Sequence, residues 1–200
     1  MRIVRILLIG ALLGGCDFQI AGPAYPEKNG GKFLAEHGYS PELIRAVVER
    51  MPLEHERVVE FTAIRSTDVR FLVASNPHLT PEEIALYMRD RDDFARSGTA
   101  WNRNLSTRQM LALMQDTSHT VYCGLARNPA VPSDLLLKLH AERKPGLVWF
   151  ALNPQCPVEI KDEIEKSNDD LAKHWLKFNE DKAKGLPAGS RGSVPAARDP

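Results

Sequence analysis

A short phrase containing Ala-x-Asn recurs four times in the middle of the chain, and it constrains the fold more than any other feature of the sequence. Successive copies are 26, 26 and 25 positions apart. Self-similarity at a fixed period of this length is typical of proteins built from stacked copies of one small unit. The asparagines of the four copies are Asn76, Asn102, Asn128 and Asn153, and each stands two positions after an alanine.

Each copy carries signals that end one helix and begin the next. Three of the four asparagines precede a proline, and the residue before a proline is pushed out of helical geometry. Capping boxes follow at Thr80–Glu83, which has a proline in its first turn, and at Ser106–Gln109. Apolar residues then recur at three- and four-residue steps, as in Ile84, Tyr87 and Met88. Each unit is therefore expected to hold one main helix and one short helix.

The repeat weakens toward both ends of this region. A first copy has His37 in the asparagine position, and looser helix starts stand at Ser40–Glu42 and Cys156–Glu159. The segment 54–64 is predicted to form a further helix, because Val58, Phe61 and Ile64 share one helical face. None of these helices can bury its apolar face alone, so stacked neighbours must bury the faces together.

The pattern V-R-x-x-L/V-A-x-N-P, best developed at Val69–Pro77, resembles the leucine-rich repeat variant family. The resemblance covers roughly residues 39–176 and is specific for residues 69–163. It implies an all-α fold, a right-handed solenoid of about four to five units that alternates α-helices with short 3₁₀ helices. The second copy departs from the family pattern, with Arg103 and Thr107 in place of its prolines. The cysteine cluster that binds an iron–sulfur centre in some members is absent, so that cofactor is not implied.

The first residues have the three parts of a secretory signal. Two arginines, Arg2 and Arg5, precede an apolar run from Ile6 to Leu13, which is followed by two glycines and Cys16. The apolar run is roughly half of the ~20 residues that span a bilayer, so a permanent transmembrane helix is not expected. Residues 1–15 are therefore predicted to be a signal peptide.

The tetrad Leu13-Gly14-Gly15-Cys16 resembles a bacterial lipobox. The resemblance implies that Cys16 receives a diacylglyceryl group on its thiol and becomes the new N-terminus. Two or more acyl chains would then hold the protein on the periplasmic face of a membrane. Asp17 resembles the signal that retains such proteins in the inner membrane, while an outer-membrane location stays open. The alternative is an ordinary signal peptide with an incidental cysteine.

Composition divides the remainder of the chain into three parts. Residues 16–32 contain two prolines and three glycines without apolar periodicity, and they are expected to form a flexible tether after the anchor. Residues 33–178 are expected to form the helical repeat domain. Residues 179–200 contain few apolar side chains to bury and are expected to be a disordered tail.

Charge and chemical motifs exclude several classes of function. The net charge is zero, and removal of residues 1–15 leaves 24 basic against 26 acidic residues, which argues against nucleic-acid binding. No catalytic motif, metal-ligand spacing or cofactor fingerprint is present, so no enzyme activity, metal or cofactor is expected. Cys123 and Cys156 stand in adjacent repeats, and either a disulfide or two buried thiols would be consistent with the sequence.

Candidate binding residues fall in two columns of the repeat. If each alanine faces the core, the residue after it faces outward, and solenoids bind partners along such columns. Trp101 and Arg127 are the strongest candidates, because these residue types are favoured interface anchors. The alternative is that Trp101 packs between repeats and Arg127 is merely solvated. The first column is Ser75, Trp101, Arg127 and Leu152, and the second, two positions after each asparagine, is His78, Asn104, Ala130 and Gln155.

These observations favour a membrane-anchored module of the cell envelope that binds a protein or peptide partner. A narrower version is an immunity or inhibitor lipoprotein that masks a toxin or an enzyme. An envelope enzyme with an unrecognised site and a purely structural spacer remain alternatives, because fold analogy alone does not decide function.

Overall fold

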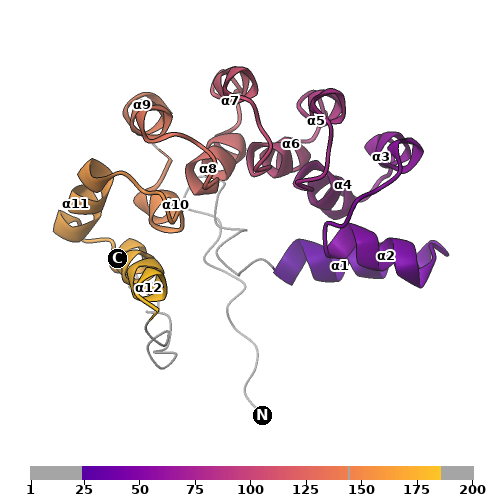
Figure 1. Ribbon diagram of the computed structural model, residues 1–200, viewed down its shortest axis with the longest axis horizontal. Coiled ribbons are helices and arrows are strands. Elements are labelled where there is room, and N and C mark those ends of the chain that lie inside the picture. The colour runs from indigo at the N-terminus through magenta and orange to yellow at the C-terminus, as the bar shows by residue number, and fades with distance from the viewer. Residues whose placement is uncertain (1–23, 144, 186–200) are drawn as a thin grey trace, which may run out of the picture.

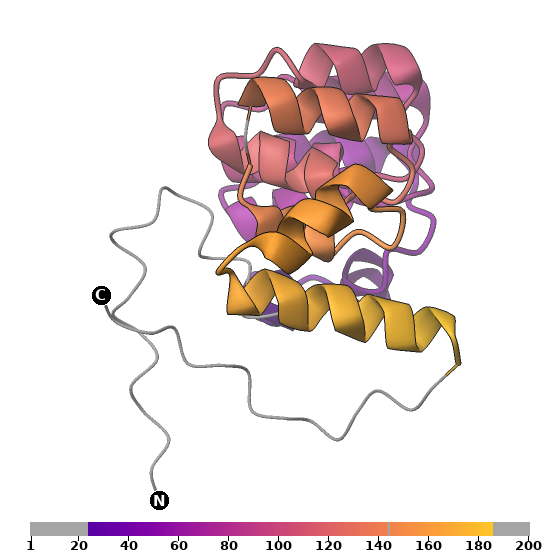
Figure 2. The same ribbon diagram turned by 90° about the vertical axis from the view of Figure 1, so that its left-hand side faces the viewer.

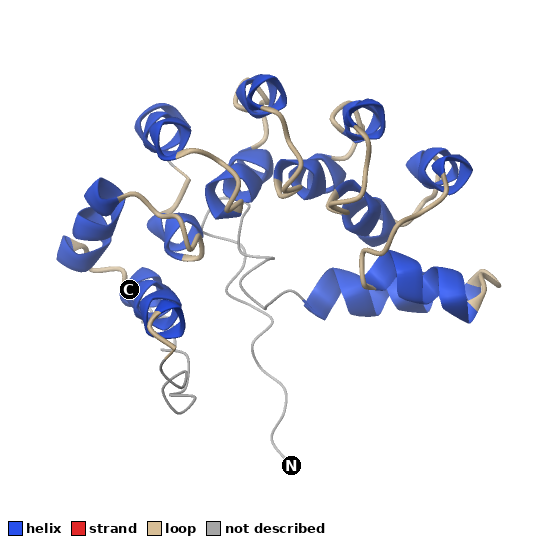
Figure 3. Ribbon diagram, viewed as in Figure 1, coloured by secondary structure: helices blue, strands red, loops and turns tan. Residues whose placement is uncertain are grey.

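The computed structural model describes residues 24–143 and 145–185, and this part of the chain contains twelve α-helices and no strand (Figure 3). The all-α prediction is therefore confirmed. The helices are α1 (Ala24–Glu36), α2 (Pro41–Val48), α3 (His55–Thr62), α4 (Thr67–Ala74), α5 (Pro81–Tyr87), α6 (Asp93–Ala100), α7 (Thr107–Leu113), α8 (His119–Arg127), α9 (Ser133–Arg143), α10 (Leu147–Ala151), α11 (Val158–Lys166) and α12 (Asp170–Ala183).

From α3 onward the helices lie in two rows that follow an arc (Figure 1). Helices α3, α5, α7, α9 and α11 form the outer row, and α4, α6, α8, α10 and α12 form the inner row. Each inner helix packs against the next one, and α1 packs against α4 at the N-terminal end. Figure 2 shows that the helices of both rows lie crosswise to the long dimension of the array. The inner row therefore forms a continuous series of helix–helix contacts from α4 to α12.

The main helices begin where the sequence places their caps. The Thr80 hydroxyl accepts the N–H of Glu83 at 3.2 Å, and the Glu83 carboxylate accepts the N–H of Thr80 at 2.8 Å. Ser106 and Gln109 form the same reciprocal box at the start of α7. Such caps satisfy backbone N–H groups that the first helical turn leaves without partners. Helix α11 differs, because its cap position is Pro157 and no side chain caps it.

Four details of the fold differ from the sequence-based expectations. The short helices are α-helices rather than 3₁₀ helices within the described residues. Bonds of the i→i−3 type occur at their ends, as between the N–H of Asn102 and the carbonyl of Thr99 at 2.9 Å and between the N–H of Trp149 and the carbonyl of Gly146 at 3.0 Å. Helix α1 begins at Ala24, inside the expected tether. His37 is exposed in the turn after α1, and its ring bonds to the Phe33 carbonyl of that helix. Helix α12 continues to Ala183, beyond the expected start of the tail.

Small side chains let the inner helices approach closely. The alanines of the repeat, Ala74, Ala100, Ala126 and Ala151, have no exposed surface. A Cβ atom added at Gly98 would lie 2.6 Å from the carbonyl oxygen of Phe71, and one added at Gly124 would lie 2.7 Å from that of Ser97. Both contacts are to the backbone of the preceding inner helix, so they cannot be relieved by a side-chain rotation. The spacing of α4, α6 and α8 thus depends on these two glycines.

We expect Gly98→Ala to lower the free energy of unfolding by about 1–3 kcal/mol, because overpacking at the α4–α6 contact outweighs the better helix propensity of alanine. Gly31→Ala in α1 is the matched control, since its nearest contact would be an ordinary 3.4 Å to Val48. The control should leave stability unchanged or raise it. Urea unfolding measures both, and equal effects of the two substitutions would contradict the close-packing account.

No helix among residues 24–143 and 145–185 combines the length and the apolar character that crossing a bilayer requires.

Candidate interaction site

The asparagines of the repeat form a series of side-chain hydrogen bonds, here named the asparagine ladder. The Nδ2 amide of Asn102, which has no exposed surface, donates to the carbonyl oxygens of Ala74 and Asn76 at 3.0 and 2.7 Å. Its Oδ1 atom accepts the N–H of Asn104 at 2.8 Å. Each side chain therefore joins its own loop to two carbonyls of the preceding repeat. The same pattern links Asn128 to Ala100 and Asn102, and Asn153 to Ala126 and Asn128.

The asparagine ladder extends beyond the four repeats found in the sequence. Asn76 donates to the Met51 carbonyl at 2.7 Å, which connects the ladder to the loop after α2. At the other end, Asn179 donates to the Ala151 carbonyl at 2.8 Å. Asn179 stands 26 positions after Asn153, so it continues the period inside the segment that is predicted to be the tail.

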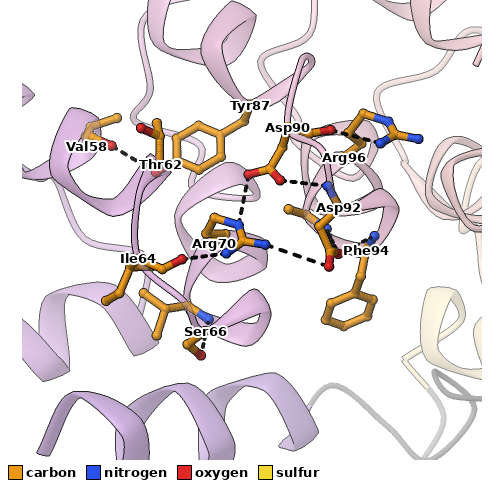
Figure 4. Close-up of polar contacts among 12 residues, drawn as sticks. Val58, Thr62, Ile64, Ser66, Arg70, Tyr87, Asp90, Asp92, Phe94 and Arg96 are labelled. Carbon is orange, nitrogen blue, oxygen red and sulfur yellow. Dashed lines mark hydrogen bonds and ion pairs between the residues drawn. The ribbon is translucent and has the colours of Figure 1, made fainter. Parts of the chain in front are cut away.

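A buried ion pair and a partly buried one hold the turns between the outer and inner rows. Arg70 is 3% exposed, and its Nε atom lies 2.9 Å from Oδ2 of Asp90 (Figure 4). Its guanidinium also donates to the Ile64 carbonyl and lies 3.7 Å from Asp92. Arg96, one period later, binds Asp116 through two bonds of 2.7 and 3.0 Å. Both arginines therefore fasten the start of an inner helix to the turn that follows the next outer helix.

Asp116 makes this arrangement dependent on pH. Burial by itself raises the pKa of Asp116, but hydrogen bonds from Arg96 and from the N–H of Ser118 outweigh it and leave the pKa below its ordinary value of 3.8. A carboxylate whose pKa is lower in the folded state than in the unfolded state stabilises the protein at pH values above its unfolded-state pKa. This stabilisation is lost as the pH falls through the folded-state pKa. Asp116→Asn should therefore destabilise the protein at neutral pH, and its difference from the parent should shrink in strong acid. Urea titrations over a pH series measure this, and a pH-independent difference would contradict the assignment.

Four side chains form a second feature, the aromatic–guanidinium stack. The Arg50 and Arg127 guanidinium carbons lie 5.4 and 5.0 Å from the centre of the Trp101 ring, and Arg127 also lies 5.5 Å from the Trp149 ring. Cation–π contacts of this kind contribute about 0.5–2 kcal/mol each, and more when they are desolvated. The stack reaches from the loop after α2, through the ends of α6 and α8, to α10. Burial lowers the pKa of Arg127 to about 10, so its guanidinium is charged at neutral pH.

Arg50 occupies an unusual backbone conformation at one end of this stack. Its φ of 54° lies in the left-handed region, which costs a residue with a Cβ atom about 1–2 kcal/mol. Its side chain binds the Ser75 hydroxyl at 2.9 Å and the Glu27 carboxylate at 2.8 Å. These contacts, together with Trp101, offset the backbone strain and hold the guanidinium in a single position.

The two predicted binding columns differ in accessibility. Ser75 is 6% exposed, because its hydroxyl is bonded to Arg50 and to the Leu72 carbonyl, so the expectation that it faces outward is wrong. Trp101, Arg127 and Leu152 are partly exposed. Two of them, Trp101 and Arg127, belong to the aromatic–guanidinium stack. His78, Asn104 and Gln155 are exposed in their loops, and Ala130 is partly exposed. The structure thus brings only Trp101 and Arg127 of the first column together.

Three residues of these features were missed in the sequence. Arg50 stands 26 positions before Asn76 and Asn179 stands 26 after Asn153, so strict counting by the period would have found both. Trp149 stands four positions before Asn153, where the two preceding repeats have glycine. Trp149 could have been identified in the sequence because a tryptophan replaces a small residue at this position in one of the four copies of the repeat.

Cys156 and the possible metal ligands among residues 24–143 and 145–185 add no further site. Cys156 is a free buried thiol, and it therefore does not form a disulfide with Cys123. Burial raises the pKa of Cys156 to about 11, which leaves the thiol protonated and unreactive at neutral pH. Within the described ranges, no group of three or more His, Cys, Asp or Glu side chains is arranged to hold a metal ion.

No protein-family model, curated protein or solved structure matches this chain.

Proposed function

We propose that the protein is a lipid-anchored module of the bacterial envelope that binds a protein or peptide partner along the ends of its inner helices. In this account the described helices form a repeat solenoid of the leucine-rich repeat variant kind. Cys16 carries the lipid on the periplasmic side, and Asp17 favours the inner membrane. The repeats serve as a rigid support, and the aromatic–guanidinium stack supplies the contact surface.

The observation that carries this proposal is the partly exposed stack around Trp101. Its ring is held between Arg50 and Arg127, so its orientation is fixed before any partner arrives. A side chain that is already ordered loses little conformational entropy on binding, which is how preorganised surfaces gain affinity. Tryptophan and arginine are also the residue types most enriched among interface hot spots. A structural spacer would not require such a partly exposed arrangement.

The position of α1 supports a close association with the membrane. Because α1 begins at Ala24, only residues 16–23 separate the proposed lipid from the helical array. An extended chain of that length reaches roughly 25–30 Å. A partner bound to the array would therefore lie at the membrane surface or in the adjacent periplasm.

Photocrosslinking in living cells tests the binding proposal. A photoreactive phenylalanine at position 101 should capture a discrete partner in the membrane fraction, and Arg127→Glu should abolish the product. The same probe at position 86, an exposed site on the outer helix α5, is the control and should capture none. A folded, membrane-bound protein that gives no product from position 101, or equal products from both positions, would contradict the proposal.

Replacing the lipidated cysteine tests the anchor. We expect Cys16→Ala to move the protein out of the membrane fraction, because a chain without acyl groups loses the hydrophobic free energy that holds it there. Fractionation and mass spectrometry of the mature N-terminus measure this change. Cys156→Ala is the matched control and should leave the protein in the membrane fraction. Retention of the Cys16 variant in that fraction would show that something other than a lipid on Cys16 holds the protein.

A further inference from the structure

Helix α6 presents two aromatic side chains on the concave side of the inner row. Phe94 and Trp101 stand seven positions apart, so they share one helical face. Both are partly exposed, whereas Ala95 and Thr99 on the other side of the helix have no exposed surface. The buried side of α6 packs into the array, and Phe94 and Trp101 therefore face the concave side of the arc (Figure 1).

Apolar side chains continue this face on other inner helices. Phe71 of α4 stacks on Phe94 with ring centres 4.6 Å apart, and its ring centre lies 6.0 Å from that of Trp101. Leu152 and Phe178 occupy the same position of the repeat as Trp101, directly before the asparagine, and both are partly exposed. An aligned series of partly exposed apolar side chains marks a binding surface. We name these five residues, Phe71, Phe94, Trp101, Leu152 and Phe178, the concave apolar face.

The described part of the chain begins beside the concave apolar face. Glu27, in the first turn of α1, binds Arg50 at 2.8 Å, and the Arg50 guanidinium carbon lies 5.4 Å from the centre of the Trp101 ring. One helical turn separates Glu27 from Ala24, so Ala24 lies within about 20 Å of that ring. In Figure 1 the N-terminal end of α1, drawn in indigo, lies on the concave side of the arc. The chain before Ala24 therefore starts close to Trp101.

The segment before α1 has the pattern and the length to cover this face. Residues 17–23 read Asp-Phe-Gln-Ile-Ala-Gly-Pro, so Phe18 and Ile20 alternate with polar residues. In an extended chain both apolar side chains would point to the same side. Seven extended residues reach roughly 23–25 Å, and packed helices lie about 8–10 Å apart. From its start beside Trp101 the segment can therefore reach across α8 to α10.

We propose that residues 17–23 dock on the concave apolar face as an extended segment, with Phe18 and Ile20 against it. A partner then reaches Trp101 only by displacing them, a consequence that rests on the proposed function. A segment attached next to its site has an effective concentration in the millimolar range, which a second copy or a separate partner would have to exceed. The chain thus supplies its own competitor for the surface around Trp101.

Intramolecular photocrosslinking tests the docking. A photoreactive phenylalanine at position 18 of the full-length protein, extracted in a neutral detergent and irradiated, should join residue 18 to α6, α8 or α10, as mass spectrometry of tryptic peptides would show. Position 19 is the matched control. Its yield should be at least about fivefold lower, because neighbouring side chains of an extended segment point to opposite sides.

Four results would overturn the docking. The first is no intramolecular product from position 18, and the second is equal yields from positions 18 and 19. The third is a product that joins an isotope-labelled copy to an unlabelled one, since the occupant would then be a second copy of the chain. The fourth is a product that carries a lipid acyl chain in place of a protein peptide, since the segment would then lie on the membrane.

Capture of the partner from position 101 tests the displacement. We expect Phe18→Ser/Ile20→Ser to raise the yield of the partner product about threefold or more, because a covered site binds with an affinity reduced by its uncovered fraction. Gln19→Ser is the control and should leave the yield unchanged. An unchanged yield in the double variant would overturn the competition. Absence of any partner product in all three proteins would count against the proposed function, and the product from position 18 then decides the docking by itself.

Discussion

Asn102→Ala is expected to lower the free energy of unfolding by about 3–5 kcal/mol, because it removes a buried side chain that makes three hydrogen bonds. The substitution removes the side-chain partner of the Ala74 carbonyl oxygen and of the Asn104 N–H, and it leaves the Asn76 carbonyl oxygen with only the N–H of Leu79, at 3.3 Å. Each buried group left unsatisfied costs about 1–3 kcal/mol, and partial relaxation of the loop reduces the sum. Urea unfolding followed by circular dichroism measures the change.

Substitutions of two other asparagines serve as comparisons for the loss of stability expected of Asn102→Ala. Asn179→Ala removes one hydrogen bond at the partly exposed end of the array and should cost about 1 kcal/mol. Asn104→Ala removes an exposed side chain that contacts the Pro77 carbonyl and should cost less still. If Asn102→Ala costs no more than Asn104→Ala, the asparagine ladder does not stabilise the stacking of the repeats.

Arg70→Met is expected to cost about 3–5 kcal/mol, because it leaves a carboxylate buried without its cation. The Asp90 side chain is 6% exposed, and Arg70 is its ion-pair partner at 2.9 Å. The same substitution also removes the donor to the Ile64 carbonyl. By contrast Arg57→Met, at an exposed pair with Glu60 on α3, should cost less than about 1 kcal/mol.

A double substitution isolates the charge from the packing. Asp90→Asn removes the negative charge but keeps an oxygen that can accept the N–H of Asp92, as Oδ1 of Asp90 does at 2.9 Å. Arg70→Met/Asp90→Asn should therefore be more stable than Arg70→Met alone, since no unpaired charge is then buried. A double variant whose loss equals the sum of the two single losses would show that the pair is not coupled.

The sequence predicted the helical content and several of the helix starts, because their causes are local. Capping residues, prolines and apolar steps of three and four act within a few positions, so Thr80 and Ser106 could be identified as helix starts without a structure. The recurrence of asparagine likewise required no knowledge of its partners. What the period did not reveal is that these asparagines bond to the repeat before them.

Helix α1 was missed for a tertiary reason. Its sequence contains two adjacent glycines and no apolar periodicity, which locally favour a flexible segment. Gly30 is buried against α4, and a Cβ atom there would lie 2.8 Å from Leu72. The residue that weakens the helix in isolation is thus the one that allows it to pack, and packing overrides propensity.

The candidate site was predicted only in part, because its contacts join residues distant in the sequence. Trp101 and Arg127 were found from their place after the alanines, but Arg50 and Trp149, which complete the stack, lie outside that column. The outward orientation expected of Ser75 failed because Arg50 covers it. Periodic reasoning treats all copies as equivalent, and the differences between copies are what form the stack.

The central claim about the packing of the helices is that the asparagines form one continuous ladder. Hydrogen exchange of the side-chain amides, followed by nuclear magnetic resonance, tests it most directly, with the exposed Asn168 as internal control. The account predicts slow exchange of the Nδ2 protons of Asn102, Asn128 and Asn153 and immediate exchange at Asn168, since buried hydrogen-bonded protons exchange only on opening. Exchange of the three ladder side chains at the rate of Asn168 would contradict the account.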